Sequence, residues 1–259
     1  MNFGLIIIGD EILSGRRQDK HFPKVVELLA ARGLRLSWAE YFGDDLDPLV
    51  AALRRSFASG DAVFCCGGIG ATPDDRTRQA AGLALGLELE LHPEAARLIT
   101  QRVAEMAAEG GGSADMNLPE NRQRLKMGEF PVGSAILPNP YNRIPGFEIR
   151  NHFFTPGFPV MAWPMIEWAL DHRFADLFHR ERRAERSFLA YDLPESTVTP
   201  LLEQIERDFP GVKTFSLPSV GEDGSRRHIE LGVKGPDHLV GPAFERLEQG
   251  TRALGAAIG

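Results

Sequence analysis

The chain of 259 residues contains very little cysteine: only Cys65 and Cys66, which are adjacent. This spacing fits neither a zinc site nor a framework of disulfides. Disulfides are rare in reducing compartments, so we expect a cytoplasmic chain. We predict that both cysteines are buried as small apolar residues rather than used as nucleophiles, because an apolar run precedes them.

Long apolar runs and an excess of positive charge are also missing. The run at residues 5–8 ends at Gly9 and Asp10 with no cleavage region of a secretory signal. No stretch approaches the ~20 apolar residues of a membrane span. Lys and Arg number 29 against 36 Asp and Glu, a net charge of −7. We therefore expect neither a membrane nor a nucleic acid as partner, although backbone amides can still bind a small anion.

Short apolar runs alternate with segments of helical periodicity in the first part of the chain. We expect strands at residues 3–8, 34–39 and 62–66, and short strands with tight turns at residues 135–137 and 147–155. We expect helices at residues 22–29, 46–53, 75–85, 93–108 and 161–178. Strands that alternate with helices predict βαβ units and an α/β fold with a mostly parallel, doubly wound sheet.

A charged run at residues 180–186 is the predicted domain boundary, which gives domains at residues 1–179 and 187–259. After it we expect a β-α-β-β-α order: strands at residues 187–191, 212–217 and 227–233, and helices at residues 195–208 and 238–254. This order is typical of a small α+β domain with both helices on one face of a sheet.

Carboxylates gather in the three loops that follow the first three expected strands. They are Asp10, Glu11, Asp44, Asp45, Asp47, Asp74 and Asp75. Like charges crowd unfavourably unless a cation or a proton is shared, and an oxygen-rich site suits Mg²⁺ together with substrate phosphates. For Asp45 and Asp47 we favour the simpler interpretation, a solvated loop ahead of a helix.

The third of these loops is also rich in glycine. Gly67, Gly68 and Gly70 let a ligand approach the backbone, Thr72 adds a hydroxyl donor, and the helix that follows presents free amides to an anion. The alternative is a tight turn in which Asp74 or Asp75 only caps the helix. The loop is not a Walker loop, since no Lys-Ser/Thr follows, and the G-x-G-x-x-G spacing is absent.

Three motifs resemble the MoaB/Mog-type molybdopterin-binding domain: residues 8–15 (Ile-Gly-Asp-Glu-Ile-Leu-Ser-Gly), 43–45 (Gly-Asp-Asp) and 67–77 (Gly-Gly-Ile-Gly-Ala-Thr-Pro-Asp-Asp-Arg-Thr). The first is similar to the competence/damage-inducible, CinA-like branch. The resemblance continues through Pro156-Gly157-Phe158-Pro159 and covers about residues 3–175. The terminal unit resembles the small KH-like domain of CinA-type proteins, and the length leaves no room for their amidase domain.

The resemblance implies a three-layer α/β/α fold, assembly as a homodimer or trimer, and a pterin or adenine nucleotide as ligand. It implies Asp44 and Asp75 as catalytic and metal-linked groups, with Mg²⁺ or Co²⁺. The implied chemistry is adenylyl transfer to molybdopterin or, in CinA-like relatives, cleavage of ADP-ribose-type pyrophosphates. The residues implied to surround the ligand are Gly9, Asp10, Glu11, Ser14, Gly15, Gly67, Gly68, Gly70, Thr72, Asp74 and Thr77.

Three segments depart from the family pattern. Ala71 stands where the family loop commonly has Pro, residues 18–21 (Gln-Asp-Lys-His) replace an Asn-rich helix start, and residues 142–144 (Asn-Arg-Ile) replace a Gly-Thr-Ala. We expect all three to face the pocket and to alter its ligand. Two alternatives therefore stay open: a binding module that senses or carries its ligand without chemistry, and a structural part of an oligomer.

Overall fold

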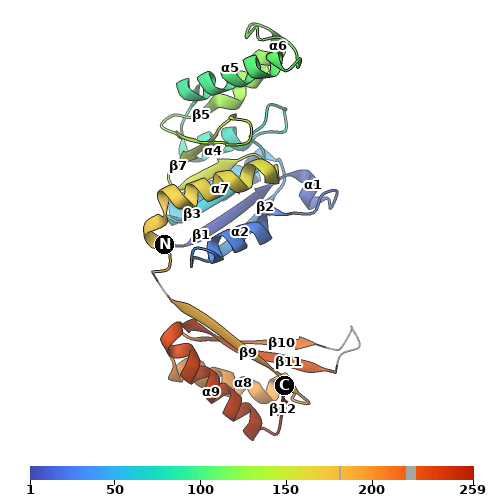
Figure 1. Cartoon of the computed structure of the whole chain (residues 1–259), viewed down its shortest axis with the longest axis vertical. Coiled ribbons are helices and arrows are strands. Elements are labelled where there is room, and N and C mark those ends of the chain that lie inside the picture. Colours follow the sequence, from blue (N-terminus) through green and yellow to red (C-terminus); the bar gives the residue numbers. More distant parts are fainter. Residues whose placement is uncertain (181, 220–225) are drawn as a thin grey trace. The chain divides into compact units, whose positions relative to one another are not determined.

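Parallel strands joined by helices form the first part of the chain, as the alternating pattern of its sequence predicts. The computed structural model describes residues 1–180, 182–219 and 226–259. These residues divide into two units, residues 1–178 and 179–259, which are described separately (Figure 1). No helix in the described ranges is long and apolar enough to cross a bilayer.

A six-stranded sheet with the strand order β2-β1-β3-β8-β7-β6 forms the centre of the first unit. Its strands are β1 (Phe3–Ile8), β2 (Leu36–Phe42), β3 (Ala62–Cys66), β6 (Ala135–Leu137), β7 (Gly146–Ile149) and β8 (His152–Thr155). The strands β2, β1, β3 and β8 are parallel, and β7 is antiparallel to its two neighbours, β8 and β6. Every residue of β1 and β3 is buried, as expected of parallel strands covered on both faces.

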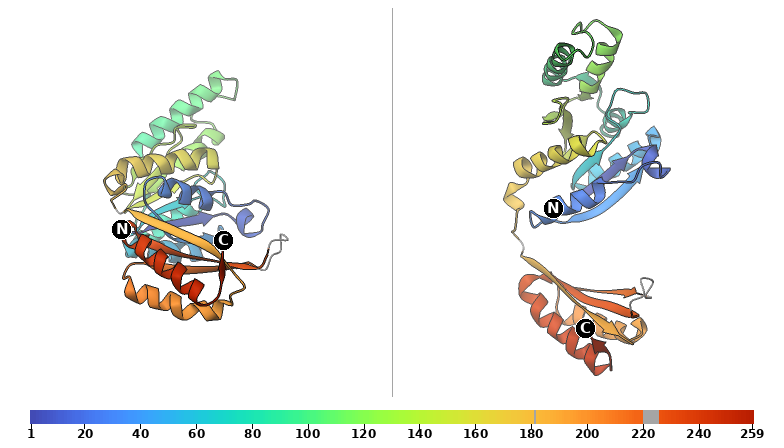
Figure 2. Two further views of the ribbon diagram at one scale, coloured as in Figure 1. Left: turned by 60° about the horizontal axis from the view of Figure 1, so that its bottom comes forward. Right: turned by 45° about the vertical axis from the view of Figure 1, so that its right-hand side comes forward.

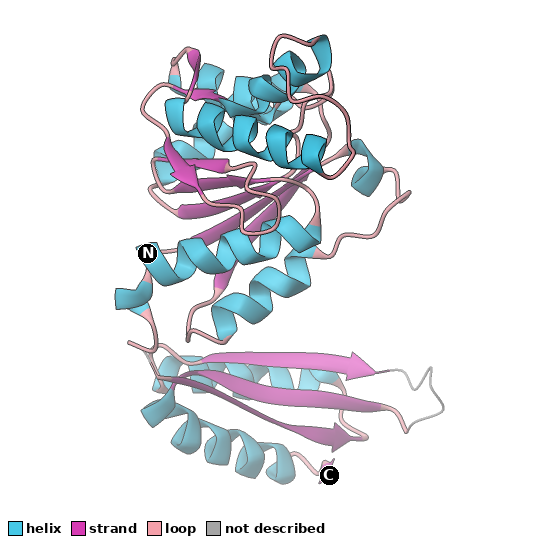
Figure 3. Ribbon diagram, turned by 45° about the horizontal axis from the view of Figure 1, so that its top comes forward, coloured by secondary structure: helices cyan, strands magenta, loops and turns pink. Residues whose placement is uncertain are grey.

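Helices cover both faces of this sheet and give three layers (Figure 3). On one face α2 (His21–Ala30) and α7 (Pro159–Arg173) share an apolar core with the sheet. On the other face α3 (Leu46–Ser59) and α4 (Thr77–Leu85) share a second core. The predicted three-layer α/β/α architecture with a mostly parallel sheet is confirmed.

Several short elements were not predicted. They are α1 (Asp10–Leu13), β4 (Leu89–Leu91), α6 (Pro119–Leu125), β5 (Glu129–Pro131) and the 3₁₀ helices Lys126–Gly128 and Ala175–Leu177. The longer α5 (Pro93–Ala108) was predicted with the same bounds. Elements of three to seven residues are too short for a period of 3.6 or 2 to be recognised, so only their surroundings determine them.

Residues 147–155, where short strands and tight turns are expected, form a hairpin of β7 and β8. Arg150 and Asn151 form its turn, with φ of 46° and 60°. Positive φ at both central residues is typical of a type I′ turn, whose twist matches that of the strands. The sequence Arg-Asn lacks the glycine that usually signals this turn, so the position of the turn could not be predicted.

The second unit has a four-stranded antiparallel sheet with the order β10-β11-β9-β12. Its elements are β9 (Arg183–Tyr191), α8 (Glu195–Asp208), β10 (Lys213–Ser219), β11 (His228–Pro236), α9 (Asp237–Ala253) and β12 (Ala257–Ile258). Both helices pack on one face of the sheet (Figure 2). This is the predicted β-α-β-β-α order with a short strand added at its end, and β9 begins already inside the charged run.

Candidate functional site

The four parallel strands end at one edge of the sheet, and every residue of the predicted ligand-binding set lies in the segments that follow three of them. These segments are residues 9–15 after β1, 43–45 after β2 and 67–77 after β3. Residues 156–158 follow β8 and lead into α7 at the same edge. The carboxyl edge of an open α/β sheet is where ligands bind in such folds.

Asp10 and Asp44 join two of these loops by a reciprocal pair of hydrogen bonds. The amide of Asp10 donates to Oδ2 of Asp44 at 3.0 Å, and the amide of Asp44 donates to Oδ1 of Asp10 at 3.2 Å. Burial raises the pKa of Asp44, and the charges of Asp10, Glu11 and Asp74 raise it further, against the hydrogen bond from the Asp10 amide. The structure therefore brings four of the predicted carboxylates within electrostatic reach of one another.

The start of the glycine-rich loop requires glycine at two positions. Gly67 has φ of 115° and Gly68 has φ of 68°. A Cβ atom at Gly67 would collide with the carbonyl of Ile8, and one at Gly68 with the hydroxyl of Thr77. Thr77 is fully buried, and its hydroxyl donates to the Gly67 carbonyl at 3.0 Å. The hydroxyl of Thr77 thus closes the loop against the start of α4.

Asp75 lies further along the same loop. Its Oδ2 atom accepts hydrogen bonds from the amide of Thr72 at 2.9 Å and from the hydroxyl of Thr72 at 2.5 Å. Its Oδ1 atom accepts none within the described ranges. Asp75 does not cap the helix that follows. It accepts hydrogen bonds from Thr72, which precedes it in the chain, and α4 begins at Thr77 without a side-chain cap.

Arg78 is a residue of this site that sequence reasoning missed. Its side chain is 4% exposed and donates to the carbonyls of Ile69 and Gly70, to the latter at 2.7 Å. Because these peptides are trans, the N–H groups of Gly70 and Ala71 point away from Arg78. Neither N–H group donates to another described residue. Arg78 therefore orients two free amides on the far side of the loop, and no sequence motif signalled this role.

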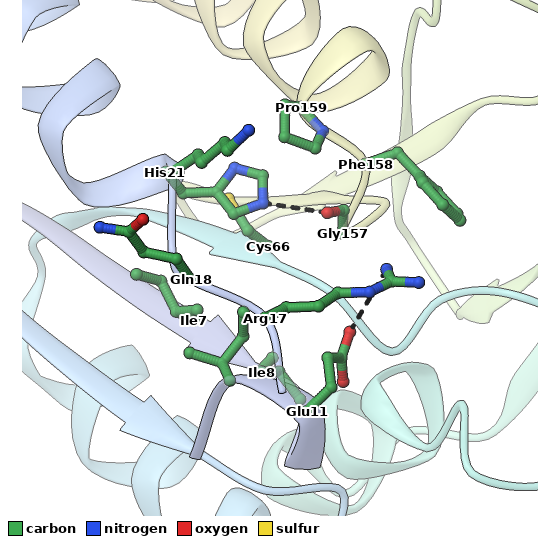
Figure 4. Close-up of a pocket in the computed structure, with 12 residues that line it drawn as sticks. Ile7, Ile8, Glu11, Arg17, Gln18, His21, Cys66, Gly157, Phe158 and Pro159 are labelled. Carbon is green, nitrogen blue, oxygen red and sulfur yellow. Dashed lines mark hydrogen bonds and ion pairs between the residues drawn. The ribbon is translucent and has the colours of Figure 1, made fainter. Parts of the chain in front are cut away.

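A cavity of about 340 Å³ opens at the same edge, between the ends of β1 and β3 and the starts of α2 and α7 (Figure 4). Ile8, Phe158 and Pro159 contribute apolar wall, while Glu11, Arg17 and Lys20 contribute charge. Arg17 and Glu11 form an ion pair at 3.9 Å. Of the predicted ligand-binding residues only Glu11 lines this cavity, so the carboxylates and the cavity are neighbouring parts of one edge.

The other predicted residues occupy simpler places. Ser14 ends α1 with its amide bonded to the Asp10 carbonyl at 2.8 Å, and Gly15 follows with φ of 73° and open space around it. Residues 142–144 do not line this cavity, and Arg143 pairs with Glu105 at 2.5 Å. That these residues face the ligand pocket stays a prediction. The altered helix start does line it, through Gln18, Lys20 and His21.

No group of three His, Cys, Asp or Glu side chains within residues 1–180, 182–219 and 226–259 is arranged to hold a metal ion. Mg²⁺ commonly takes one or two carboxylates and completes its shell with waters and substrate phosphates. The crowded carboxylates around Asp44 fit a cation bound in that manner, because a cation would relieve the repulsion that raises the pKa of Asp44.

Comparison with known proteins supplies a family. The family described as "Probable molybdopterin binding domain" matches residues 4–175. A CinA-like protein of Citrifermentans bemidjiense is 34% identical over 171 residues, 64% of this chain and 39% of that protein. A protein of Caldivirga maquilingensis is 28% identical over 255 residues, 96% of this chain and 94% of that protein.

A crystal structure of the protein CinA with unknown function, from Thermoplasma acidophilum, has the same fold. It covers 66% of this chain and 98% of its own with a TM-score of 0.55 at 24% identity. The chain spans only part of its CinA-like relatives, 39% of the length of one and 62% of another.

Proposed function

Because this chain belongs to the family of probable molybdopterin binding domains, we propose that it binds a phosphorylated pterin or adenine nucleotide at the carboxyl edge of its six-stranded sheet. One observation carries the proposal: the reciprocal bonds between Asp10 and Asp44 hold a carboxylate cluster beside a glycine-rich loop with two free amides. Free amides suit phosphate oxygens, and carboxylates suit a cation that bridges to the same phosphates.

The enzymatic form of the proposal is the metal-dependent cleavage of an ADP-ribose-type pyrophosphate. A divalent ion, Mg²⁺ or Co²⁺, supplies charge neutralisation of the phosphates and a more acidic water. Asp44 and Asp75 are the proposed metal-linked and catalytic groups. Asp75 can offer its Oδ1 atom while Oδ2 keeps its bonds to Thr72, so the loop need not change shape.

The chain's own groups would then position the substrate. The N–H groups of Gly70 and Ala71, oriented by Arg78, would bind phosphate oxygens and stabilise negative charge that develops on them. Arg17 and Lys20 line the neighbouring cavity and would attract an anionic ligand toward it. The related chemistry, adenylyl transfer to molybdopterin, would use the same groups on the same type of phosphoanhydride.

The second candidate is a binding module without chemistry. It is favoured by the free amides of Gly70 and Ala71, which can bind an anion without any metal. A module of this kind needs only the loop amides and the cavity, and its carboxylates would select the ligand by charge.

Release of AMP separates the two candidates. The purified chain is incubated with ADP-ribose and Mg²⁺ or Co²⁺, in parallel with Asp44→Asn, Asp75→Asn and the control Asp47→Asn. Asp47 is exposed in the first turn of α3 and serves as the control at the same edge. If the chain is an enzyme, we expect AMP release that is abolished in Asp44→Asn and Asp75→Asn and retained in Asp47→Asn. Tight binding of ADP-ribose in calorimetry without AMP release would support the binding module. The absence of both binding and AMP release would contradict both candidates.

A further inference from the structure

The two adjacent cysteines at the end of β3 face opposite sides of the sheet. Cys65 lies in the core shared with α3 and α4, while Cys66 lies in the core shared with α2 and α7. Both are buried, as predicted. Only Cys66 also lines the 340 Å³ cavity, so a small molecule in that cavity would meet one thiol and not the other.

His21 stands beside Cys66 in the wall of the same cavity (Figure 4). It is the first residue of α2 and is 4% exposed. Asp19 fixes its backbone, since Oδ1 of Asp19 accepts from the His21 amide at 2.7 Å. The imidazole Nε2 atom lies 3.1 Å from the carbonyl of Gly157. A carbonyl only accepts, so Nε2 carries the hydrogen and Nδ1 is the nitrogen left to take a proton.

Nδ1 of His21 is buried and has no hydrogen-bond partner within the described ranges. A buried nitrogen without a partner costs free energy, unless the site uses it. Burial lowers the pKa of His21, yet Cys66, the Gly157 carbonyl and the Asp19 carboxylate together raise it to about 9. Around the cavity the remaining charges are Glu11, Arg17 and Lys20. The surroundings therefore favour a proton on the imidazole of His21.

Cys65 has no such neighbour. Burial raises the pKa of the Cys65 thiol well above its ordinary value, and the adjacent Cys66 raises it further. Thiols become reactive beside a histidine cation, and buried thiols in apolar surroundings are inert. Cys66 differs from Cys65 in that it shares a cavity wall with His21.

We propose that Cys66, with His21 as its proton acceptor, is a nucleophilic site at the floor of this cavity for a small ligand that carries an electrophilic carbon. The thiol proton passes to Nδ1 of His21, and a sulfur lone pair forms the new carbon–sulfur bond. The leaving group departs from that carbon with the electron pair of the broken bond. The site uses neither Asp44 nor Asp75, so it is independent of the hydrolysis proposed above.

Iodoacetamide is a suitable probe, because it is a small electrophile whose reaction with a thiolate releases iodide. Trypsin places both cysteines in one peptide, residues 56–76, and fragmentation between them reports each alkylation separately. In the full chain we expect Cys66 to react at least ~10 times faster than Cys65 at neutral pH. Equal rates at the two cysteines would overturn the proposal.

One further measurement isolates the role of His21. In His21→Asn the rate at Cys66 is expected to fall at least ~10-fold near pH 7, with Cys65 in the same peptide as the internal control. A Cys66 rate that is unchanged by the substitution contradicts the pair.

Discussion

At the scale of single residues, the negative charge of Asp44 lowers the stability of the folded chain. In the proposed function the same charge binds a cation. The folded chain binds its proton more tightly than the unfolded chain, since burial and three carboxylates raise its pKa. Its contribution to stability therefore falls as pH rises above the ordinary range of an aspartate and stays lower at neutral pH. Such carboxylate crowding is tolerated where a cation or an anionic ligand with its cation is to be bound.

We predict that Asp44→Asn raises the stability of the metal-free chain at pH 7 by up to about 1 kcal/mol, since this carboxylate is partly exposed and screened. The Asn side chain can still accept from the Asp10 amide. Added Mg²⁺ should raise the melting temperature of the unaltered chain more than that of the variant. Thermal unfolding with and without Mg²⁺ measures both effects, and a destabilised variant would count against the crowding.

Arg78→Met tests the buried guanidinium that holds the loop. The substitution leaves two loop carbonyls without their donor, and we expect a loss of about 2–4 kcal/mol in the free energy of unfolding. Arg76→Met is the matched control, because Arg76 is exposed and should cost less than about 1 kcal/mol. Urea unfolding at one pH compares the two variants. Equal losses in the free energy of unfolding would contradict the role of Arg78 in holding the loop.

Because burial lowers the pKa of His152, we expect the stability of the folded chain to depend on pH. His152 is fully buried between the carbonyl of Arg150 and the hydroxyl of Ser56, and burial lowers its pKa to about 4. The unfolded chain binds this proton first, so stability is lost as pH falls from about 6.5 toward 4. A shift of that size is worth about 3 kcal/mol. His152→Gln should flatten the difference between unfolding at pH 7 and pH 4.5, and an unchanged difference would refute the assignment.

At the scale of elements, the glycine-rich loop depends on backbone conformation more than on side chains. Gly67→Ala places a Cβ atom against the carbonyl of Ile8, which cannot move without disturbing β1. We expect a loss of at least about 2 kcal/mol. Gly60→Ala is the control: Gly60 has a similar positive φ of 74° but open space, so about 1 kcal/mol is expected. Urea unfolding of both variants measures the two losses. A larger loss for Gly67→Ala than for Gly60→Ala is the part due to the collision with the Ile8 carbonyl, and equal losses would contradict that collision.

The long elements could be predicted from the sequence because their residues alternate or repeat with a clear period. The parallel strands of the first unit, its main helices and the β-α-β-β-α order of the second unit all follow from that pattern. The type I′ turn at Arg150 and Asn151 could not, since neither residue is a usual signal for it. Likewise α1 and α6 are too short to repeat.

The candidate site could be predicted only in part, and for a similar reason. Loops that follow parallel strands must meet at one edge, so the gathering of Asp10, Asp44 and the glycine loop was accessible from spacing. The contacts of Arg78 bridge eight or nine residues across an irregular loop, and the neighbourhood of His21 and Cys66 joins segments far apart in the chain. Such contacts leave no local pattern, and a buried arginine is not distinguished from an exposed one by its letter.

At the scale of the whole molecule, the resemblance read from three motifs over residues 3–175 is confirmed by the family match at residues 4–175. Assembly as a homodimer or trimer stays a prediction, which light scattering on the purified chain would test. The described residues of the second unit contribute nothing to the carboxylate cluster or the cavity, whose residues all lie within 1–178.

The measurement that tests the central claim most directly is a calorimetric titration of ADP-ribose with Mg²⁺ into the full chain, Asp44→Asn and Asp47→Asn. The account predicts saturable binding of one ligand per chain, weakened at least ~10-fold, or about 1.4 kcal/mol, by Asp44→Asn and unchanged by Asp47→Asn. Absence of binding by the full chain, or equal binding by all three proteins, would contradict a phosphate site built on this carboxylate cluster.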